Sequence, residues 1–261
     1  MKTKLSLLIL TAILLLMPSC IKMVKGDGQV TEMDVQVTDF DELSVACPFG
    51  EIRYVQSDAA PALSVTTDKN VYDKLEIKQE GQEITIKLKE PYKDKIFFPS
   101  KFIVTANSKT LKEFQLAGKA TFNLDSPLTS ERLKISVAGA GTINLNDSVN
   151  IETLKISLAG SSTVNAPKLC ISELSADIAG SGTYNLGGTA QKSSFSIAGK
   201  GKVKALDLKT AEVSCNVAGY ASLAFYATDK IKAQIAGYSR LKYKGNPQIT
   251  QEGFASVSKV D

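Results

Sequence analysis

Residues 138–145 read AGAGTINL, and this stretch decides the fold because close copies follow at 159–166 (AGSSTVNA) and 179–186 (AGSGTYNL). The Ala-Gly pair occurs seven times, with steps of 21, 21, 20, 19, 20 and 18 residues. A fixed period of this length is typical of repeat architectures. Glycine suits a backbone corner, because it accepts a positive φ and lets stacked backbones approach closely. The sequence therefore predicts structural corners at Gly118, Gly139, Gly160, Gly180, Gly199, Gly219 and Gly237.

Apolar and polar residues alternate on both sides of each Ala-Gly pair. Around the second pair, Ile135 and Val137 precede the corner, while Ile143 and Leu145 follow it. This period of two is the pattern of half-buried strands. A strand, a corner and a second strand every 20 residues predict one coil of an all-β solenoid, with equivalent residues stacked at about 4.8 Å. A meander or sandwich is the alternative, although its strand pairs need not keep a fixed period.

The repeated pattern Ala-Gly-x-(Gly or Ser)-Thr-x-Asn, seen at 138–144 and 179–185, resembles that of one known family. The family is described as "putative auto-transporter adhesin, head GIN domain", and the resemblance covers about residues 40–255. It implies a single-stranded right-handed parallel β-helix of the pectin-lyase type, in a bacterial envelope protein with no assigned catalytic site or cofactor. The repeated residues are structural, so the resemblance says more about fold than about ligand.

The N-terminus is predicted to be a signal peptide over residues 1–19. Lys2 and Lys4 precede an apolar run over 5–16. A helix of that length, at about 1.5 Å per residue, is too short to cross a hydrocarbon core of roughly 30 Å. Cys20 then stands where bacterial lipoprotein signals place the acylated cysteine, and ordinary cleavage near Ser19 is the alternative. We therefore expect a lipid anchor at Cys20 that attaches the protein to the bacterial outer membrane. The sequence does not indicate which leaflet of that membrane holds the lipid.

Three parts are expected after the signal peptide. Residues 20–38 are predicted to be a tether between the lipid and the domain. Residues 39–261 are predicted to form one β-helix domain. Within it we expect irregular coils and a hairpin cap over 39–110, regular Ala-Gly coils over 111–245, and a C-terminal cap over 246–261. A separate small β domain over 30–110 stays open.

Composition excludes several function classes. The formal net charge is +4, and it falls to +2 once Lys2 and Lys4 are removed, which is too small to indicate nucleic acid. The chain has no His, which removes Ser-His and Cys-His catalysis and the commonest metal ligand. Cys47, Cys170 and Cys215 are an odd number, so we expect small buried side chains rather than a disulfide framework. No metal or cofactor is predicted.

Outward side chains differ along the predicted solenoid. In the first four coils they are mostly Thr and Asn, for which stacked ladders are the expected role and a glycan surface the alternative. In the last three they are mostly cations and tyrosines, and residues 200–261 carry a net charge of +5. An anionic glycan, a lipid head group or an acidic envelope protein could bind there. The alternative is that these charges only keep the protein soluble and protect the sheet edge from aggregation. The predicted binding set is Tyr220, Tyr238, Arg240, Lys242, Lys202 and Lys204.

Catalysis is not predicted. Glycoside hydrolysis needs two carboxylates on one face, roughly 5 to 10 Å apart, and the outward positions hold none. Loop acids such as Asp125 and Asp147 lie one coil apart, so a carbohydrate-active β-helix enzyme, a polysaccharide lyase or hydrolase, remains the alternative. The predicted function, which rests mostly on the family resemblance, is a non-catalytic, lipid-anchored, adhesin-like binding or structural module of the cell envelope. The oligomeric state is left open.

Overall fold

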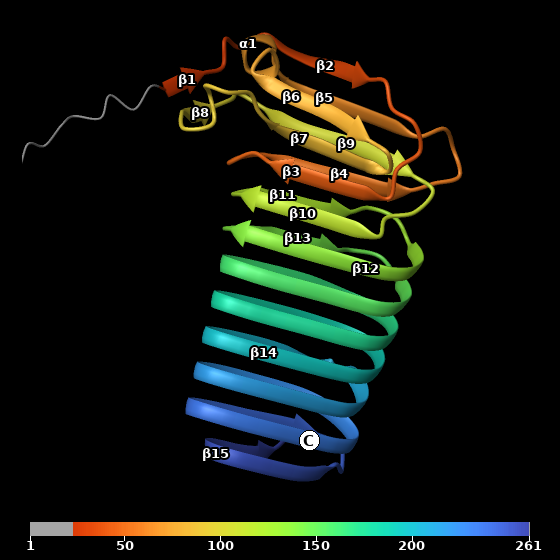
Figure 1. The fold of residues 1–261 in the computed structure, drawn as a ribbon. Coiled ribbons are helices and arrows are strands. Elements are labelled where there is room, and N and C mark those ends of the chain that lie inside the picture. Colours follow the sequence, from red (N-terminus) through yellow and green to blue (C-terminus); the bar gives the residue numbers. More distant parts are fainter. Residues whose placement is uncertain (1–22, 261) are drawn as a thin grey trace, which may run out of the picture.

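The computed structural model describes residues 23–260, and nearly all of the repeat region lies in strands (Figure 1). One large mixed sheet holds thirteen strands and does not close into a barrel. The predicted signal peptide and Cys20 lie outside the described residues. Within 23–260, no helix has the length and apolar character needed to span a bilayer.

Successive coils pair in parallel, and the first repeats keep an offset of 21 residues. β10 (Glu113–Gly118) pairs with β12 (Leu128–Gly139), and β11 (Thr121–Leu124) pairs with β13 (Thr142–Leu145). Phe114 thus lies beside Ile135, and Phe122 beside Ile143, each 21 residues on. β14 (Val149–Lys244) continues the same winding as one long ribbon of stacked coils (Figure 1). The 20-residue period in the sequence therefore corresponds to one coil.

The seven corner glycines form a column. All have a positive φ, from +116° at Gly160 to +135° at Gly237. A methyl group at Gly180 would stand 2.5 Å from the carbonyl oxygen of Gly160, and each later corner crowds the preceding one in the same way. Glycine is required twice over, by the backbone conformation and by the neighbouring coil. Because the corners are aligned, equivalent side chains of neighbouring coils lie next to one another.

The core lies inside the coils and consists of stacked apolar residues. The Phe114 and Phe122 rings face each other across it, with centroids 4.0 Å apart. Tyr184 is also buried, and its hydroxyl donates to the carbonyl oxygens of Ile156 and Asp177 at 3.2 and 3.0 Å. Inside the corner there is little room, since a Cβ at Gly182 would stand 2.9 Å from Ile178 Cδ1. This crowding explains why the second residue after each corner is Gly, Ala or Ser.

The N-terminal strands stack on the first repeats and end in antiparallel strands. β3 (Glu42–Ala46) and β4 (Glu51–Gln56) stack on β10 and β11, and β7 (Glu83–Leu88) and β9 (Phe102–Ser108) stack on them in turn. β6 (Leu75–Glu80) closes one side as a hairpin with β7. β5 (Ala62–Asp68) and β2 (Val30–Val35) close the other, and α1 (Lys69–Tyr72) follows β5. These strands belong to the same sheet as the repeats.

The segment predicted to be a tether contains two strands. β2 is the outermost strand of the main sheet, and β1 (Met23–Lys25) pairs with β8 (Ile96–Phe98) in a separate two-stranded sheet. The tether prediction for 20–38 therefore does not hold at 23–25 and 30–35, where the chain is paired in sheets. Short strands with long-range partners carry no local pattern that distinguishes them from a linker.

The C-terminal segment, predicted to be a cap, is one more coil. β15 (Gln248–Lys259) pairs in parallel with β14, and its corner is Gly253, with a φ of +91°. Its inward residues Ile249 and Val257 are only half-buried, because none of residues 23–260 covers the outer side of this coil. The expectation for the cysteines also fails in part: Cys47 and Cys215 are buried, whereas Cys170 is exposed.

Candidate functional site

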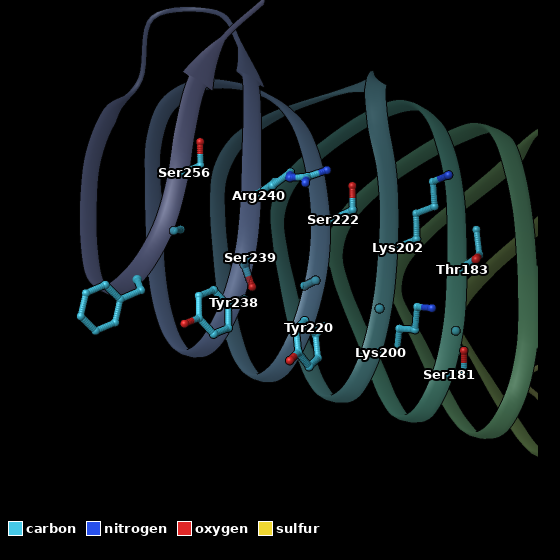
Figure 2. A pocket seen from close by; sticks show the side chains of 15 residues that line it. Ser181, Thr183, Lys200, Lys202, Tyr220, Ser222, Tyr238, Ser239, Arg240 and Ser256 are labelled. Carbon is cyan, nitrogen blue, oxygen red and sulfur yellow. The ribbon is translucent and has the colours of Figure 1, made fainter.

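A surface groove of about 950 Å³ runs across the last coils, next to the corner column. One wall is a row of residues that directly follow the corners, and the other is a row two positions further on. Figure 2 shows Lys200, Tyr220 and Tyr238 in the first row, and Lys202, Ser222 and Arg240 in the second. Phe254 and Ser256 extend the two rows onto the final coil.

The groove follows from the repeat itself. Between the two rows lies the small residue that crowding at the corner demands, namely Gly201, Ala221 or Ser239. Each of these residues is buried, so only short side chains and backbone form the floor. Each coil therefore contributes one wall residue on each side and one low point between them. The groove runs along the stack of coils because these positions lie next to one another in successive coils.

Three aromatic rings form most of one wall. Tyr220, Tyr238 and Phe254 are 64%, 75% and 83% exposed. The two tyrosine rings are nearly parallel, with centroids 6.2 Å apart and an interplanar angle of 17°. Ser239 pairs with Ala255, which places Phe254 beside Tyr238. Exposed aromatic side chains gathered in a row are typical of binding surfaces rather than of a solvated face.

The other groups in the groove are cationic or neutral. Lys200, Lys202 and Arg240 line it, and no lining residue is Asp or Glu. The ion pairs found among residues 23–260 do not involve these three side chains. Their charge is therefore not compensated inside the groove, which favours an anionic ligand.

The structure brings together four of the six predicted binding residues. Tyr220, Tyr238, Arg240 and Lys202 line the groove. Lys204 and Lys242 are exposed but lie two positions further along their coils, outside it. Phe254 was missed because Gly253 follows Glu252 and lacks the Ala-Gly signal of the other corners. The signal that could have identified Phe254 is a corner glycine, Gly253, followed directly by an aromatic residue.

The Asn side chains of the earlier coils form the stacked ladder that the favoured prediction expects. Each amide group of the ladder donates to the one below it: Asn144 to Asn123 at 2.8 Å, Asn165 to Asn144 at 2.7 Å, and Asn185 to Asn165 at 2.7 Å. Asn123 ends the ladder by donating to Glu51 Oε1 at 2.7 Å. These side chains are half-buried and largely satisfied by one another, which leaves few groups for a ligand.

The loop acids considered for catalysis have other neighbours. Asp125 accepts a hydrogen bond from Asn146 at 3.3 Å, and Asp147 lies 3.9 Å from Lys168 Nζ. Neither carboxylate lines the groove. Within residues 23–260, no group of three or more His, Cys, Asp or Glu side chains could hold a metal ion.

Parallel strands stacked coil upon coil, with an open groove along one side, define a class of repetitive all-β scaffolds. The chain belongs to the family described as "Putative auto-transporter adhesin, head GIN domain", whose model matches residues 39–167 and 134–247. The resemblance seen in the repeats is thereby confirmed. Membership in a family described as an adhesin head domain indicates a protein of the cell envelope or surface.

Solved structures support the same family and fold. A "putative lipid binding protein" from Parabacteroides distasonis ATCC 8503 is 31% identical, with a TM-score of 0.87 over 92% of this chain and 100% of that one. A "putative adhesin" from the same organism is 30% identical, with a TM-score of 0.82 over 92% and 100%. A "putative adhesin" from Parabacteroides merdae ATCC 43184 is 30% identical, with a TM-score of 0.80 over 92% and 99%. No curated protein matches the chain.

Proposed function

We propose that this protein is a non-catalytic, lipid-anchored envelope module that binds an anionic sugar chain in its C-terminal groove. The scaffold is a single-stranded right-handed parallel β-helix over residues 39–261. The parallel pairing of successive coils, with an offset of 21 residues in the first repeats, and the column of corner glycines support this description of the fold. The outer membrane is the proposed location, with Cys20 as the anchored residue.

The observation that carries the proposal is the pairing of an aromatic row with uncompensated cations in one groove. The C–H faces of sugar rings pack on aromatic rings, and here the rings of Tyr220 and Tyr238 repeat along the axis. Arginine and lysine bind carboxylate, sulfate or phosphate groups, and Lys202 and Arg240 stand on the facing wall. A ligand with repeating rings and regular negative charge fits this arrangement.

Two sources could supply such a ligand: a free anionic polysaccharide or the head of a glycolipid. One solved relative is described as a "putative lipid binding protein", which makes the glycolipid source worth a separate measurement. The groove extends over several coils, on the order of 20 Å at the strand spacing, so it can take more than one sugar ring. The shared chemistry is a negatively charged sugar chain.

The position of the groove agrees with an adhesive role. Met23 begins the described chain at one end of the solenoid, and β15 lies at the other (Figure 1). An acyl chain on Cys20, three residues before Met23, would hold the groove away from the membrane. A ligand in the surroundings of the cell could then reach it.

The test is binding of the full-length protein to free anionic glycans, to matched neutral glycans and to vesicles that carry an anionic glycolipid. We expect binding to the anionic probes only, weakened by salt because exposed charges are screened. Lys202→Glu with Arg240→Glu should abolish it. Lys155→Glu with Lys209→Glu makes the same charge change outside the groove and should preserve binding. Equal binding by both double variants would overturn the proposal.

A further inference from the structure

A second group of exposed apolar side chains lies at the end of the molecule opposite the groove. Among residues 23–260, the large apolar side chains that are clearly exposed fall mainly into two sets. Tyr220, Tyr238 and Phe254 form the groove wall. Met23, Ile96 and Phe98, exposed by 68%, 44% and 54%, all belong to the small β1–β8 sheet. This second set has no part in the proposed ligand site.

The three side chains share one face because of the strand register. Met23 pairs with Ile96 and Lys25 pairs with Phe98 in parallel, so these four residues point outward together. Val24 and Phe97 point the other way and pack on the protein, where the Phe97 ring lies 5.6 Å from that of Phe49. The outer face of this sheet is therefore apolar, with Lys25 at its edge. We call this face of Met23, Lys25, Ile96 and Phe98 the apolar pad.

The pad is held firmly on the domain by Asp68. This buried carboxylate accepts hydrogen bonds from Gly28 N at 2.8 Å, Ser100 N at 2.6 Å and Ser100 Oγ at 2.8 Å. These bonds fix the chain just after β1 and just after β8. Gly26 N also donates to Phe98 O at 3.0 Å, and Asn70 Nδ2 to Lys25 O at 2.8 Å. The orientation of the pad is thus set by the folded domain.

Chain length ties the pad to the proposed anchor. Met23 is three residues from Cys20, and an extended chain spans at most about 3.5 Å per residue. A lipid on Cys20 would therefore bring the bilayer surface to within about 10 Å of Met23. Exposed apolar side chains flanked by lysine are suited to the interface between acyl chains and head groups. Lys25 on the pad and Lys95 just before β8 supply the positive charge.

We propose that the apolar pad rests in the same membrane leaflet that holds the lipid on Cys20. This inference rests on the anchor in the proposed function and adds a defined contact surface to it. The contact fixes how the solenoid stands on the membrane, because the pad is rigidly attached to the N-terminal coils. A flexible tether would leave that orientation free.

The test uses the absence of tryptophan from the chain. Phe98→Trp places a single fluorophore on the pad, and Phe254→Trp places a matched one at the exposed end of the groove. Both variants are prepared as the acylated protein in phosphatidylethanolamine–phosphatidylglycerol vesicles, with and without brominated acyl chains. We expect the emission of Phe98→Trp to shift to shorter wavelength and to be quenched by the brominated lipid. Phe254→Trp should show neither change.

Flotation of the vesicles and the intact mass of the mature protein report the anchor independently. If the protein floats with vesicles and Phe98→Trp is not quenched, the pad inference is overturned while the anchor stands. Quenching of Phe254→Trp alone would overturn it as well. If the protein carries no lipid and does not float, the anchor and the pad fail together. Met23→Trp probes the other strand of the pad and should repeat the Phe98→Trp result.

Discussion

The side-chain amide of Asn165 donates to Asn144 Oδ1 at 2.7 Å, across the boundary between two coils. Asn144 in turn donates to Asn123, so one residue is both acceptor and donor in the ladder. A regular polar ladder therefore runs along the outside of the coils, parallel to the apolar core. It fixes the rotation of each coil against its neighbour, because a coil shifted by one residue would lose the amide contacts.

Replacing Asn144 by Ala should break the ladder in the middle. Two hydrogen bonds between half-buried amides are lost, so we expect a loss of about 1 to 2 kcal/mol in the free energy of unfolding, measured by urea denaturation. Asn146→Ala is the matched control on the same coil. Its side chain is exposed and bonds Asp125 at 3.3 Å, so a change below about 0.5 kcal/mol is expected. An equal loss of unfolding free energy in both variants would mean that the ladder does not stabilise the fold more than an exposed hydrogen bond does.

Replacing the corner residue Gly180 by Ala should be far more damaging. The new side chain would sit at a φ of +117° and 2.5 Å from the Gly160 carbonyl oxygen, so we expect a loss of about 3 kcal/mol or more. Gly81→Ala separates backbone strain from crowding, since Gly81 has a φ of +60° with no atom within 4 Å of its Cβ. That control should lose only about 1 kcal/mol. Thermal unfolding of the two variants makes the comparison.

Asp68 is predicted to stabilise the N-terminal end in a pH-dependent way. Burial alone would raise the pKa of Asp68, but the hydrogen bonds from Ser100 and Gly28 hold the pKa below its usual value. A lowered folded-state pKa contributes stability above the unfolded value of about 3.9 and loses it as pH falls through the folded value. Asp68→Asn should therefore cost about 2 kcal/mol at neutral pH. The difference from wild type should shrink below about pH 4; an unchanged difference at low pH would argue against this role.

Tyr238 should contribute to ligand affinity through its ring. Tyr238→Ala removes the central aromatic residue of the groove, and we expect binding of an anionic glycan to weaken about tenfold. Tyr226 lies on the same coil as Tyr220 but outside the groove, with Lys244 Nζ 5.6 Å from its ring centroid. Tyr226→Ala should bind as wild type does. Titration calorimetry with one anionic oligosaccharide measures both affinities.

The described cysteines should differ sharply in reactivity. Burial raises the pKa of Cys47 and of Cys215 to about 12, so both stay protonated and protected near neutral pH. Cys170 is exposed. A maleimide should label Cys170 rapidly in the folded protein, and Cys170→Ser should remove that fast reaction. Cys47 and Cys215 should react only on unfolding, as peptide mapping by mass spectrometry would reveal.

The regular coils could be predicted because their pattern is local. The Ala-Gly pair, the small residue after it and the alternation around it recur in every coil, so the corners and the outward phase follow from spacing alone. The ends of the molecule break this pattern. β1 and β8 are three-residue strands whose partners lie 73 residues apart, and β2 and β5 pair antiparallel. Such pairings depend on long-range packing that no short segment encodes.

The groove could be predicted only in part, for a related reason. Outward positions were identified correctly, which placed Tyr220, Tyr238, Arg240 and Lys202 on one surface. Lys204 and Lys242 also point outward, but they lie two positions beyond the second wall and do not line the groove. The pairing of the last coil shifts register between Ile235 and Ser239, where three residues of the preceding coil face Phe254 alone, so the spacing falls from 18 to 16 residues. A search for a fixed period of about 20 residues does not detect a coil with such irregular spacing.

The column of glycines at the corners makes the number of coils adjustable. Each coil rests only on its two neighbours, so gaining or losing one 20-residue unit in the middle would leave the apolar pad and the groove unchanged. Each added unit would move the two ends apart by about 4.8 Å. The number of repeats thus determines the distance between the two ends of the molecule. Relatives with more or fewer coils could therefore hold the surface at the far end at different distances from the cell.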